Sequence, residues 1–492
     1  MSEFRLVCFS SEILYGNDVI VDFINPNKEF DKNLLSTLII GPNGTGKSRL
    51  LSTICEVFRS LERLKNETSN LQNDPFKAEF YLSYYYNENY FEVEQRNNNY
   101  KFKCNSKIIE PRDLWLPQKV LAVSFMVNDK FLYNKTEFGE DKIYEYLGVR
   151  HTSNATFVNT VVRRIIDNII ELSVNNEFII NLKSILEFLK LDNKIRIYFG
   201  AGKRKKTVFN KKINEKEIEN LLEKISERSD YRSDGLKKYS REDVYEIVEF
   251  LNNRILHSKN IKRDNGSSLY YDIDLDSAEN NIAINKDYDV LNKLIKLGYI
   301  QYPTLHIGRE SSFDFELASS GEKQFLFTMI NILSKIEHGS IVLIDEPEIS
   351  LHPNWQINYI NYLKSIFSHY RSCHFIIATH SHFMISDLEP NSSSIVSLKI
   401  KNNSVRAQLH DEDTFGWSVD DILYNIFDVF TTRNLYIARE IDSFLAKISK
   451  GVENKALKKE LSKLIEIRRH LKENDPLRDV LNMIISRVDD ND

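Results

Sequence analysis

The chain has 492 residues, of which 42% are hydrophobic and 28% charged, and its 66 basic and 71 acidic residues give a net charge of -5. This composition is typical of a soluble globular protein with two or three domains, and it argues against a protein covered in positive charge. No apolar run approaches the about 18 residues of a membrane span, and the N-terminus lacks the apolar core of a signal peptide, so we expect no membrane segment. The cysteines are far apart and form no C-x-x-C pair, which favours reduced thiols in a cytoplasmic protein: Cys8, Cys55, Cys104 and Cys373.

Residues 1–149 are predicted to combine β-strands with one long helix. An apolar run at 34–40 leads into a glycine-rich segment, which is followed by a helical pattern from Arg49 to about Arg63. The continuous apolar run at 120–125 suits a central, buried strand. Other strand-like segments, of which the first two are short and expected to be antiparallel, lie at 4–9, 19–23, 77–86, 90–95 and 100–104.

Residues 150–300 are predicted to form a mainly helical insertion, because apolar residues recur there at helical spacing. Within it, residues 194–212 carry eight basic residues and no acidic one. This basic run has two interpretations. It is either an arm that neutralises the phosphates of a nucleic acid or a solvated loop, and the loop is the commoner use of a charge run.

Residues 301–412 return to a mixed β and α pattern. Short apolar runs at 340–345 and 374–378 suit strands of a buried parallel sheet. A closing hairpin is predicted from 394–400 and 404–409.

Residues 413–492 are predicted to be a helical C-terminal region. The stretch at 435–448 has apolar residues on one face, and it either packs on the rest of the chain or docks a partner.

The glycine-rich segment GPNGTGKS, at 41–48, matches the phosphate-binding loop G-x-x-x-x-G-K-[ST] in the required context, after a strand and before a helix. Small residues let successive backbone N–H groups curl around phosphates. Lys47 would place a cation between the β- and γ-phosphates, and Ser48 would offer its hydroxyl to Mg²⁺. The sequence therefore predicts a nucleotide site here.

Two later strands end in residues that suit the same chemistry. Asp345 ends the 340–345 strand, where a carboxylate can hold Mg²⁺ through its water shell. Glu346 follows and would accept the proton of a water that attacks the γ-phosphate. His380 follows the 374–378 strand, and a neighbouring strand would bring it beside the same phosphate.

The stretch ELASSGEKQF, at 316–325, resembles a helix entrance. Ser319 and Glu322 fit the S-x-x-E capping box before an apolar run. Gly321 leaves the backbone open where a helix N-terminus can hold an anion.

The sequence resembles the ATP-binding-cassette (ABC) ATPases, because it contains, in this order, the phosphate loop, SSGEKQ, LIDEPE and ATHS. It resembles the Rad50, RecF and OLD branch of this group in the forms DEPEISLHP and THS. The resemblance covers roughly 1–145 and 300–410. It implies an α/β fold: an ABC-ATPase head, with a P-loop NTPase sheet and an antiparallel β subdomain, carrying a helical insertion and a C-terminal helical region. Within the branch, YEYLGVRHTSNATF, THSHFMISDL and TFGWSVDDIL are similar to the PtuA family of AAA-type ATPases, which act in Septu and retron-associated anti-phage defence systems.

The resemblance assigns roles to residues of this chain. The cofactors it implies are ATP and Mg²⁺, with Mg²⁺ held by Ser48 and Asp345, Glu346 as the general base, and His380 as the phosphate-sensing switch. The signature motif would act on the ATP of a partner protomer, which implies a homodimer or higher homo-oligomer, and residues 350–352 occupy the place of the D-loop at the dimer seam. Nucleotide contacts fall on Asn43, Gly44, Thr45, Gly46, Lys47 and Ser48, and the signature motif on Ser319, Gly321 and Glu322.

The chain departs from the family pattern at two places. The family usually has a glutamine just after the 120–125 strand, whereas MVND follows here and Gln118 precedes the strand. Either Asn128 substitutes for that glutamine or the coupling to the insertion differs, so no residue is assigned. OLD proteins also carry a Toprim nuclease domain, but the acidic clusters at 411–413 and the C-terminus follow no strand-like run, so we predict no nuclease in this chain.

The expected function is that of a cytoplasmic, Mg²⁺-dependent ATPase of a bacterial anti-phage system. For a PtuA-like chain without a nuclease, the resemblance implies a separate HNH nuclease partner, similar to PtuB. The basic run at 194–212 offers a contact for nucleic acid, including the RNA–DNA of a retron. The alternatives are a Rad50- or RecF-like repair ATPase that clamps DNA, and the ATPase subunit of a membrane transporter, against which the insertion and the missing glutamine both count.

Overall fold

The computed structural model divides the chain into two compact units, Met1–Phe415 and Gly416–Asp492. The residues that the structure describes are 3–15, 19–25, 34–66, 76–97, 99–126, 128–132, 142–148, 157–202, 209, 212–226, 239–258, 261–264, 268–277, 281–308, 318–386, 388–401, 404–410, 414, 417, 421–423, 426–427, 441–446, 454–471 and 476–489.

The largest sheet of the first unit is made by β3 (Leu35–Ile40), β8 (Val120–Ser124), β9 (Tyr144–Tyr146), β14 (Ile341–Asp345), β15 (His374–Ala378), β16 (Ser393–Lys401) and β17 (Ser404–His410). Their order is β17-β16-β3-β15-β14-β8-β9, and β17 alone among them runs antiparallel to its neighbour. All residues of β3, β8, β14 and β15 are buried, as the continuous apolar runs predicted. The strand predicted from 120–125, β8, is an interior strand, paired with β14 on one side and with the edge strand β9 on the other.

A second sheet of the first unit is antiparallel. Its strands are β1 (Phe4–Ser11), β2 (Val21–Asp22), β4 (Phe80–Tyr86), β5 (Asn89–Arg96), β6 (Asn99–Cys104) and β7 (Lys107–Ile108), in the order β2-β1-β4-β5-β6-β7. The predicted antiparallel pairing of the first two strands is confirmed. Two short helices lie in the same part of the chain, α1 (Glu12–Tyr15) and the 3₁₀ turn η2 (Pro111–Asp113).

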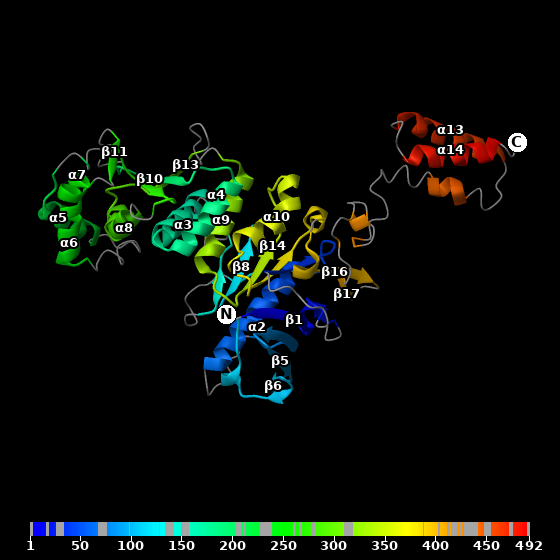
Figure 1. Cartoon of the computed structure of the whole chain (residues 1–492), viewed down its shortest axis with the longest axis horizontal. Coiled ribbons are helices and arrows are strands. Elements are labelled where there is room, and N and C mark those ends of the chain that lie inside the picture. Colours follow the sequence, from blue (N-terminus) through cyan, green and yellow to red (C-terminus); the bar gives the residue numbers. More distant parts are fainter. Residues whose placement is uncertain are drawn as a thin grey trace. The chain divides into compact units, whose positions relative to one another are not determined.

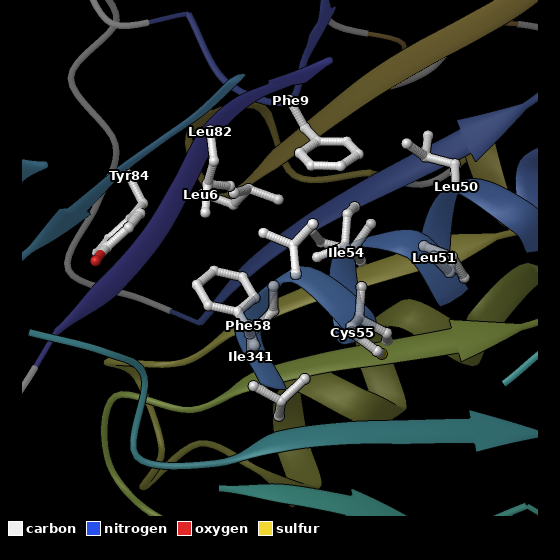
Figure 2. Close-up of a cluster of buried hydrophobic side chains, with 14 of the residues drawn as sticks. Leu6, Phe9, Leu50, Leu51, Ile54, Cys55, Phe58, Leu82, Tyr84 and Ile341 are labelled. Carbon is white, nitrogen blue, oxygen red and sulfur yellow. The ribbon is translucent and has the colours of Figure 1, made fainter. Parts of the chain in front are cut away.

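The helix α2 (Lys47–Asn66) joins these two sheets into one core. Its apolar residues recur every three to four positions and therefore form one face, which is buried from Leu50 to Leu61 and partly buried at Leu64. Leu50, Ile54 and Phe58 of this face lie between side chains of β1 and β4 on one side and of β14 on the other (Figure 2). The core thus fixes the first turn of α2 against the ends of the parallel strands.

The segment between β9 and α9 contains the predicted helices and also a sheet that the sequence did not indicate. The helices are α3 (Phe157–Leu172), α4 (Asn176–Phe188), α5 (Glu215–Ser226), α6 (Arg241–Glu249), the π-helical turn η3 (Phe250–Arg254), α7 (Ile255–His257) and α8 (Asn281–Lys296). The sheet has the order β11-β12-β10-β13 and is formed by β10 (Lys194–Gly200), β11 (Lys262–Asp264), β12 (Ser268–Asp274) and β13 (Thr304–Ile307).

The basic run at 194–212 is therefore not one continuous arm or loop. Its first residues form β10, where Arg196 forms a two-point hydrogen-bonded ion pair with Asp272 of β12. Lys194 likewise lies 3.8 Å from Asp274. Residues 203–208, which include the KRKK stretch, lie outside the described residues. Two basic side chains that were considered for phosphate contacts are thus already paired with carboxylates.

Helices of this segment pack on α9 (Ser320–Lys335) and α10 (Pro353–Ile366). Figure 1 shows α3 and α4 beside α9. Phe188, at the end of α4, contacts Phe325 of α9 and both Trp355 and Tyr362 of α10, with ring centroids 3.8 to 5.2 Å apart. One aromatic residue thus connects the inserted segment to both helices.

The second unit, Gly416–Asp492, has its own small core. Its helices include α13 (Asn454–His470) and α14 (Pro476–Asp489), which bury Leu461, Leu464 and Leu481 together with Phe444. Most of the 435–448 stretch and all of residues 411–413 and 490–492 lie outside the described residues. Among the helices that the structure describes, none is long and apolar enough to cross a membrane.

Candidate nucleotide-binding site

The loop between β3 and α2 has the backbone that its glycines permit. Gly44 and Gly46 have φ angles of +86° and +84°, in the left-handed region that residues with a side chain rarely adopt. Thr45 is buried and donates a 2.9 Å hydrogen bond from Oγ1 to the carbonyl of Pro42, whereas Asn43 and Gly44 are exposed. The loop therefore curls back on itself at its start and presents its tip to solvent.

Lys47 begins α2 and turns its ammonium group back under this loop. Its Nζ donates to the carbonyl of Gly41 at 2.8 Å and lies 3.4 Å from Nδ1 of His380. Burial is the main cause that lowers the pKa of Lys47, to about 8, while nearby acidic residues, Glu346 first, act in the opposite direction. A buried cation at the base of a loop of backbone N–H groups is suited to hold phosphate.

Ser48 and Asp345 meet at the carboxyl ends of the parallel strands. Ser48 Oγ donates a 3.0 Å hydrogen bond to Oδ1 of Asp345, which is the last residue of β14 and only 1% exposed. Burial raises the pKa of Asp345 to about 7, although the bond from Ser48 acts against this. A hydroxyl and a buried carboxylate are hard oxygen ligands, so this pair fits Mg²⁺, whose charge would compensate the buried carboxylate.

Glu346 and His380 lie side by side, just after the ends of the neighbouring strands β14 and β15. Asp345 is paired in register with Ala378 of β15, and Glu346 donates its backbone N–H to the carbonyl of Ala378 at 2.9 Å. Glu346 has a φ of +50°, a costly angle for a residue with a side chain, and such strain is concentrated at functional sites. Its Oε1 lies 3.5 Å from Nε2 of His380.

The protons of His380 can be assigned from its neighbours. Burial, followed by the charge of Lys47, lowers the pKa of His380, and Glu346 acts in the opposite direction. The ring is therefore neutral at pH 7, with Nδ1 accepting from Lys47 and the proton on Nε2, which faces Glu346. A continuous polar chain thus runs from the lysine of the loop to the predicted base.

Glu348 was not singled out in the sequence, yet it supports this chain. Its Oε1 accepts a 2.5 Å hydrogen bond from the backbone N–H of His380. Its Oε2 is buried without a hydrogen-bond partner among the described residues, and burial raises the pKa of Glu348. The signal was available, because Glu348 is the second glutamate of the DEPE motif.

The helix entrance at α9 is capped as predicted. Ser319 Oγ accepts from Glu322 N–H at 3.2 Å, and Glu322 Oε2 accepts from Ser319 N–H at 2.9 Å. The expectation that Gly321 leaves the backbone open is wrong, however. Gly321 is buried, and a Cβ at this position would lie 2.5 Å from the carbonyl oxygen of Ser350. Because Gly321 has no side chain, the predicted D-loop can approach the start of α9. Ser319 remains exposed.

The predicted D-loop is also bonded to the strand end that carries His380. Gln356 of α10 donates from Nε2 to the carbonyl of Leu351 at 2.9 Å, and its Oε1 accepts a 2.6 Å hydrogen bond from Ser381 Oγ. Ser350 has a φ of +67°, which marks a tight turn. One glutamine therefore connects the predicted D-loop, which contacts Gly321, with the segment after β15.

The structure thus brings five predicted residues into one connected group: Lys47, Ser48, Asp345, Glu346 and His380. The first two begin α2, the next two stand at the end of β14, and the last follows the end of β15. The three signature residues form a separate group with the segment at Ser350. Gln118, which precedes β8, bonds Tyr86 OH at 2.9 Å.

One curated relative is similar in sequence to part of this chain. The chain is 25% identical, over 188 residues, to the Septu protein PtuA of Bacillus thuringiensis, a match that covers 34% of this chain and 46% of the relative. The chain thus spans less than half of the length of that relative.

Solved structures similar to this chain include the SMC head domain from Thermotoga maritima, with 12% identity, a TM-score of 0.33 and coverage of 83% of this chain and 100% of that one. The recombination mediator protein RecF is also similar, with 13% identity, a TM-score of 0.29 and coverage of 82% and 98%. The mainly parallel seven-stranded sheet, with the phosphate loop between β3 and α2, and the antiparallel six-stranded sheet together have the architecture of a P-loop ATPase head of the ABC type with an antiparallel β subdomain.

Residues 17–385, three quarters of the sequence and the whole of the site, match the AAA ATPase domain family. The match begins before the phosphate loop and ends after His380, so it includes every residue of the connected group. The chain belongs to the AAA ATPase domain family.

Proposed function

We propose that this protein binds ATP at residues 41–48 and hydrolyses it to ADP and phosphate, with Glu346 as the general base. The observation that carries the proposal is the chain of contacts Lys47–His380–Glu346 beside the Ser48–Asp345 pair. Phosphoryl transfer needs positioned charge more than covalent chemistry, and this group supplies a cation, a paired hydroxyl and carboxylate, and a base in one place.

Each residue has a role that follows from its position. The backbone of Asn43, Gly44, Thr45 and Gly46 would surround the phosphates, and Lys47 would exchange its carbonyl partners for phosphate oxygens. Ser48 and Asp345 would hold Mg²⁺, which neutralises charge on the phosphates when bound. Glu346 would take the proton of the attacking water, and His380, held through its N–H by Glu348, would orient Glu346.

We further propose that hydrolysis needs two copies of the chain. Ser319 is an exposed cap at a helix N-terminus, and its own hydroxyl and the first N–H groups of α9 would bind the γ-phosphate held by a partner protomer. Gly321 and Glu322 would order that entrance. The assembly would be a homodimer, or a larger oligomer built from such pairs.

The biological role that fits best is anti-phage defence through a partner HNH nuclease. The similarity to the Septu protein PtuA supports it, over less than half of that protein's length. ATP binding and hydrolysis would control the nuclease through the pairing of protomers. Co-purification of an HNH protein encoded beside this chain tests the role, and stimulation of ATP turnover by DNA alone would favour the DNA-clamping alternative instead.

Phosphate release from ATP by the purified full-length protein tests the activity. We expect turnover that stops when EDTA removes Mg²⁺ and resumes when Mg²⁺ is restored. The proposal fails if the protein neither binds nor hydrolyses ATP in the presence of Mg²⁺.

A further inference from the structure

A cavity of about 300 Å³ lies at the edge of the large sheet that is opposite the proposed nucleotide site. Its walls come from the residue before β3, the last turns of α10 and the segments that precede β15 and β16. These three strands are parallel, so their amino ends lie together at this edge. The phosphate loop follows the other end of β3, about 20 Å away along a strand of this length. The cavity is therefore separate from the connected group around Lys47.

The cavity is large enough to hold a small molecule. Pockets that bind ligands begin at about 300 Å³, a volume that corresponds to about ten water molecules. The lining combines Leu34, which is 2% exposed, with six polar or charged side chains. A small polar molecule with a short apolar part fits such a lining.

One wall of the cavity contains a buried lysine whose donors are all used. The side chain of Lys364 is 10% exposed, and its Nζ donates to Glu389 Oε2 at 3.1 Å and to the hydroxyls of Ser392 and Ser393 at 2.6 and 2.9 Å. These bonds use the three N–H donors of the ammonium group. Ser392 also donates to Glu389 Oε2, at 2.9 Å, whereas Oε1 has no partner among the residues that the structure describes. The lysine thus fixes and neutralises a carboxylate at the cavity.

A second cation at the cavity has no carboxylate partner. Arg371 is exposed and donates from Nε to the carbonyl of Ser368 at 3.2 Å, but within the described part of the chain its guanidinium forms no ion pair. Its main chain is fixed, since its own carbonyl accepts a 2.9 Å hydrogen bond from the buried Arg5. Two cations and one carboxylate in the lining leave a net charge of +1. The ligand that this charge favours is an anion.

Two neutral donors line the cavity together with this arginine. Ser365 and Ser368 are exposed there, and their hydroxyls make no hydrogen bond to another described residue. The carbonyls at the end of α10 do not oppose an anion, because that of Leu363 accepts from Phe367 N–H at 3.0 Å and that of Phe367 from Tyr370 N–H at 2.8 Å. The cavity therefore offers a planar guanidinium and two hydroxyls to one ligand.

We propose that this cavity binds the phosphate group of a small phosphorylated molecule. Arg371 would hold two phosphate oxygens through its fork of N–H donors, and Ser365 and Ser368 would donate to the third. A phosphate presents three acceptor oxygens, whereas a carboxylate presents two. Oε1 of Glu389 would accept from a hydroxyl or amino group elsewhere in the same molecule. The inference goes beyond the proposed ATPase function and does not depend on it, because the cavity shares no residue with that site.

The test measures the binding of glycerol 3-phosphate to the whole chain by ligand-detected NMR, without ATP. The protein carries Lys47→Ala, so that the phosphate loop does not hold the probe. We expect glycerol 3-phosphate to bind and glycerol not to bind, since the phosphate supplies the charge that Arg371 recognises. Inorganic phosphate should bind about fivefold or more weakly, because it offers no second group to Glu389.

Arg371→Gln, added to this protein, should lower the affinity for glycerol 3-phosphate by about tenfold or more, the usual loss for a charge-assisted hydrogen bond. Arg112→Gln is the matched control, because Arg112 is exposed on η2 and lies outside the lining, so the affinity should not change. Ser365→Asp is a second variant, which places a negative charge at the exposed rim of the cavity and should abolish binding.

The inference is wrong if glycerol 3-phosphate does not bind, or if Arg371→Gln and Arg112→Gln bind it equally well. If Arg371→Gln does not fold, Ser365→Asp decides, and unchanged binding by that variant overturns the inference. Equal affinities for glycerol 3-phosphate and inorganic phosphate would remove the role given to Glu389. Arg371→Gln in the otherwise wild-type chain should bind ATP as the wild type does, so a failure here leaves the proposed ATPase function standing.

Discussion

Ser48 Oγ donates a 3.0 Å hydrogen bond to Asp345 Oδ1, and this bond joins residues that are 297 positions apart in the sequence. It closes the proposed nucleotide site, because Ser48 comes from the first turn of α2 and Asp345 from the end of β14. Both are held by the core in which α2 lies between the two sheets. The position of the proposed metal ligands is thus a direct consequence of packing on α2.

Lys47→Ala should weaken ATP binding by about tenfold to a hundredfold, because a buried charge-assisted contact is worth roughly 1.5–3 kcal/mol. Titration with a fluorescent ATP analogue measures this. Lys65→Ala is the control, since Lys65 lies in the last turn of α2 and bonds the carbonyl of Leu114. Equal affinity for the wild type and Lys47→Ala would remove Lys47 from the site.

The affinity of the wild-type protein for ATP should also depend on pH through Lys47. Its pKa is lowered to about 8, mainly by burial. The side chain is therefore charged below this pH and loses its proton as the pH rises through it, so affinity should fall between about pH 7.5 and 9. The same titration at several pH values checks this, and Lys47→Ala should show a flatter profile.

Gly321→Ala should lower both stability and ATP turnover. The added Cβ would lie 2.5 Å from the carbonyl oxygen of Ser350, and backbone does not yield cheaply at this distance. Overpacking of this kind costs about 1–3 kcal/mol, against about 1 kcal/mol that alanine gains in helix propensity. Gly200→Ala is the matched control, since its Cβ would meet nothing closer than 3.7 Å. Thermal melting and phosphate release measure both effects, and a Gly321→Ala variant with wild-type turnover would contradict the account.

Ser319→Arg should leave each protomer folded and able to bind ATP, yet prevent ATP-driven pairing and hydrolysis. The arginine would occupy the exposed helix entrance that we assign to the phosphate of a partner. Ser240→Arg is a stringent control, because Ser240 forms the same kind of capping box on α6 of the insertion. Both variants lose a cap worth about 1 kcal/mol, but only Ser319→Arg should stay monomeric in size-exclusion chromatography with ATP. Full turnover by a strictly monomeric preparation would show that the stretch is only a cap.

Stability should decrease in mild acid through His374. This buried histidine accepts from Leu6 N–H at Nδ1 and carries its proton on Nε2, 2.8 Å from Thr37 Oγ1, so both nitrogens are used by the neutral ring. Burial, followed by the charge of Arg5, lowers the pKa of His374 well below its usual value. The unfolded chain takes up a proton below about pH 6.5 that the folded chain excludes, so stability is complete above this pH and declines below it.

Urea unfolding between pH 7.5 and 5.5 measures that decline. One excluded proton contributes up to about 1.4 kcal/mol per pH unit. His374→Gln should lower stability at neutral pH but reduce the pH slope by up to this amount. An unchanged slope in the variant would mean that His374 is not the group responsible.

Much of the candidate site was predictable because its signals are local. A glycine-rich loop between a strand and a helix, and carboxylates at the ends of continuous apolar runs, identify Lys47, Ser48 and Asp345 from neighbouring residues alone. Parallel strands then bring their ends to one edge of the sheet, which is why Glu346 and His380 were expected together.

The remaining features depend on contacts that sequence patterns do not contain. β10 reads KIRIYFG, and its alternation was overlooked because its charged residues merge with the basic run that follows. Asn128 is exposed whereas Asp129 is buried, and this depends on how one turn is held by Ser52 and Tyr146. The burial of Gly321 likewise depends on the approach of a loop from another part of the chain.

In the proposed mechanism, Glu346 removes the proton of the water that attacks ATP. The most direct measurement compares ATP binding and phosphate release, in Mg²⁺, for the wild type and Glu346→Gln. Glutamine keeps the size of the side chain but cannot accept the proton, so we expect unchanged ATP binding with turnover reduced by about a hundredfold or more. Turnover at the wild-type rate by the Glu346→Gln protein would contradict it.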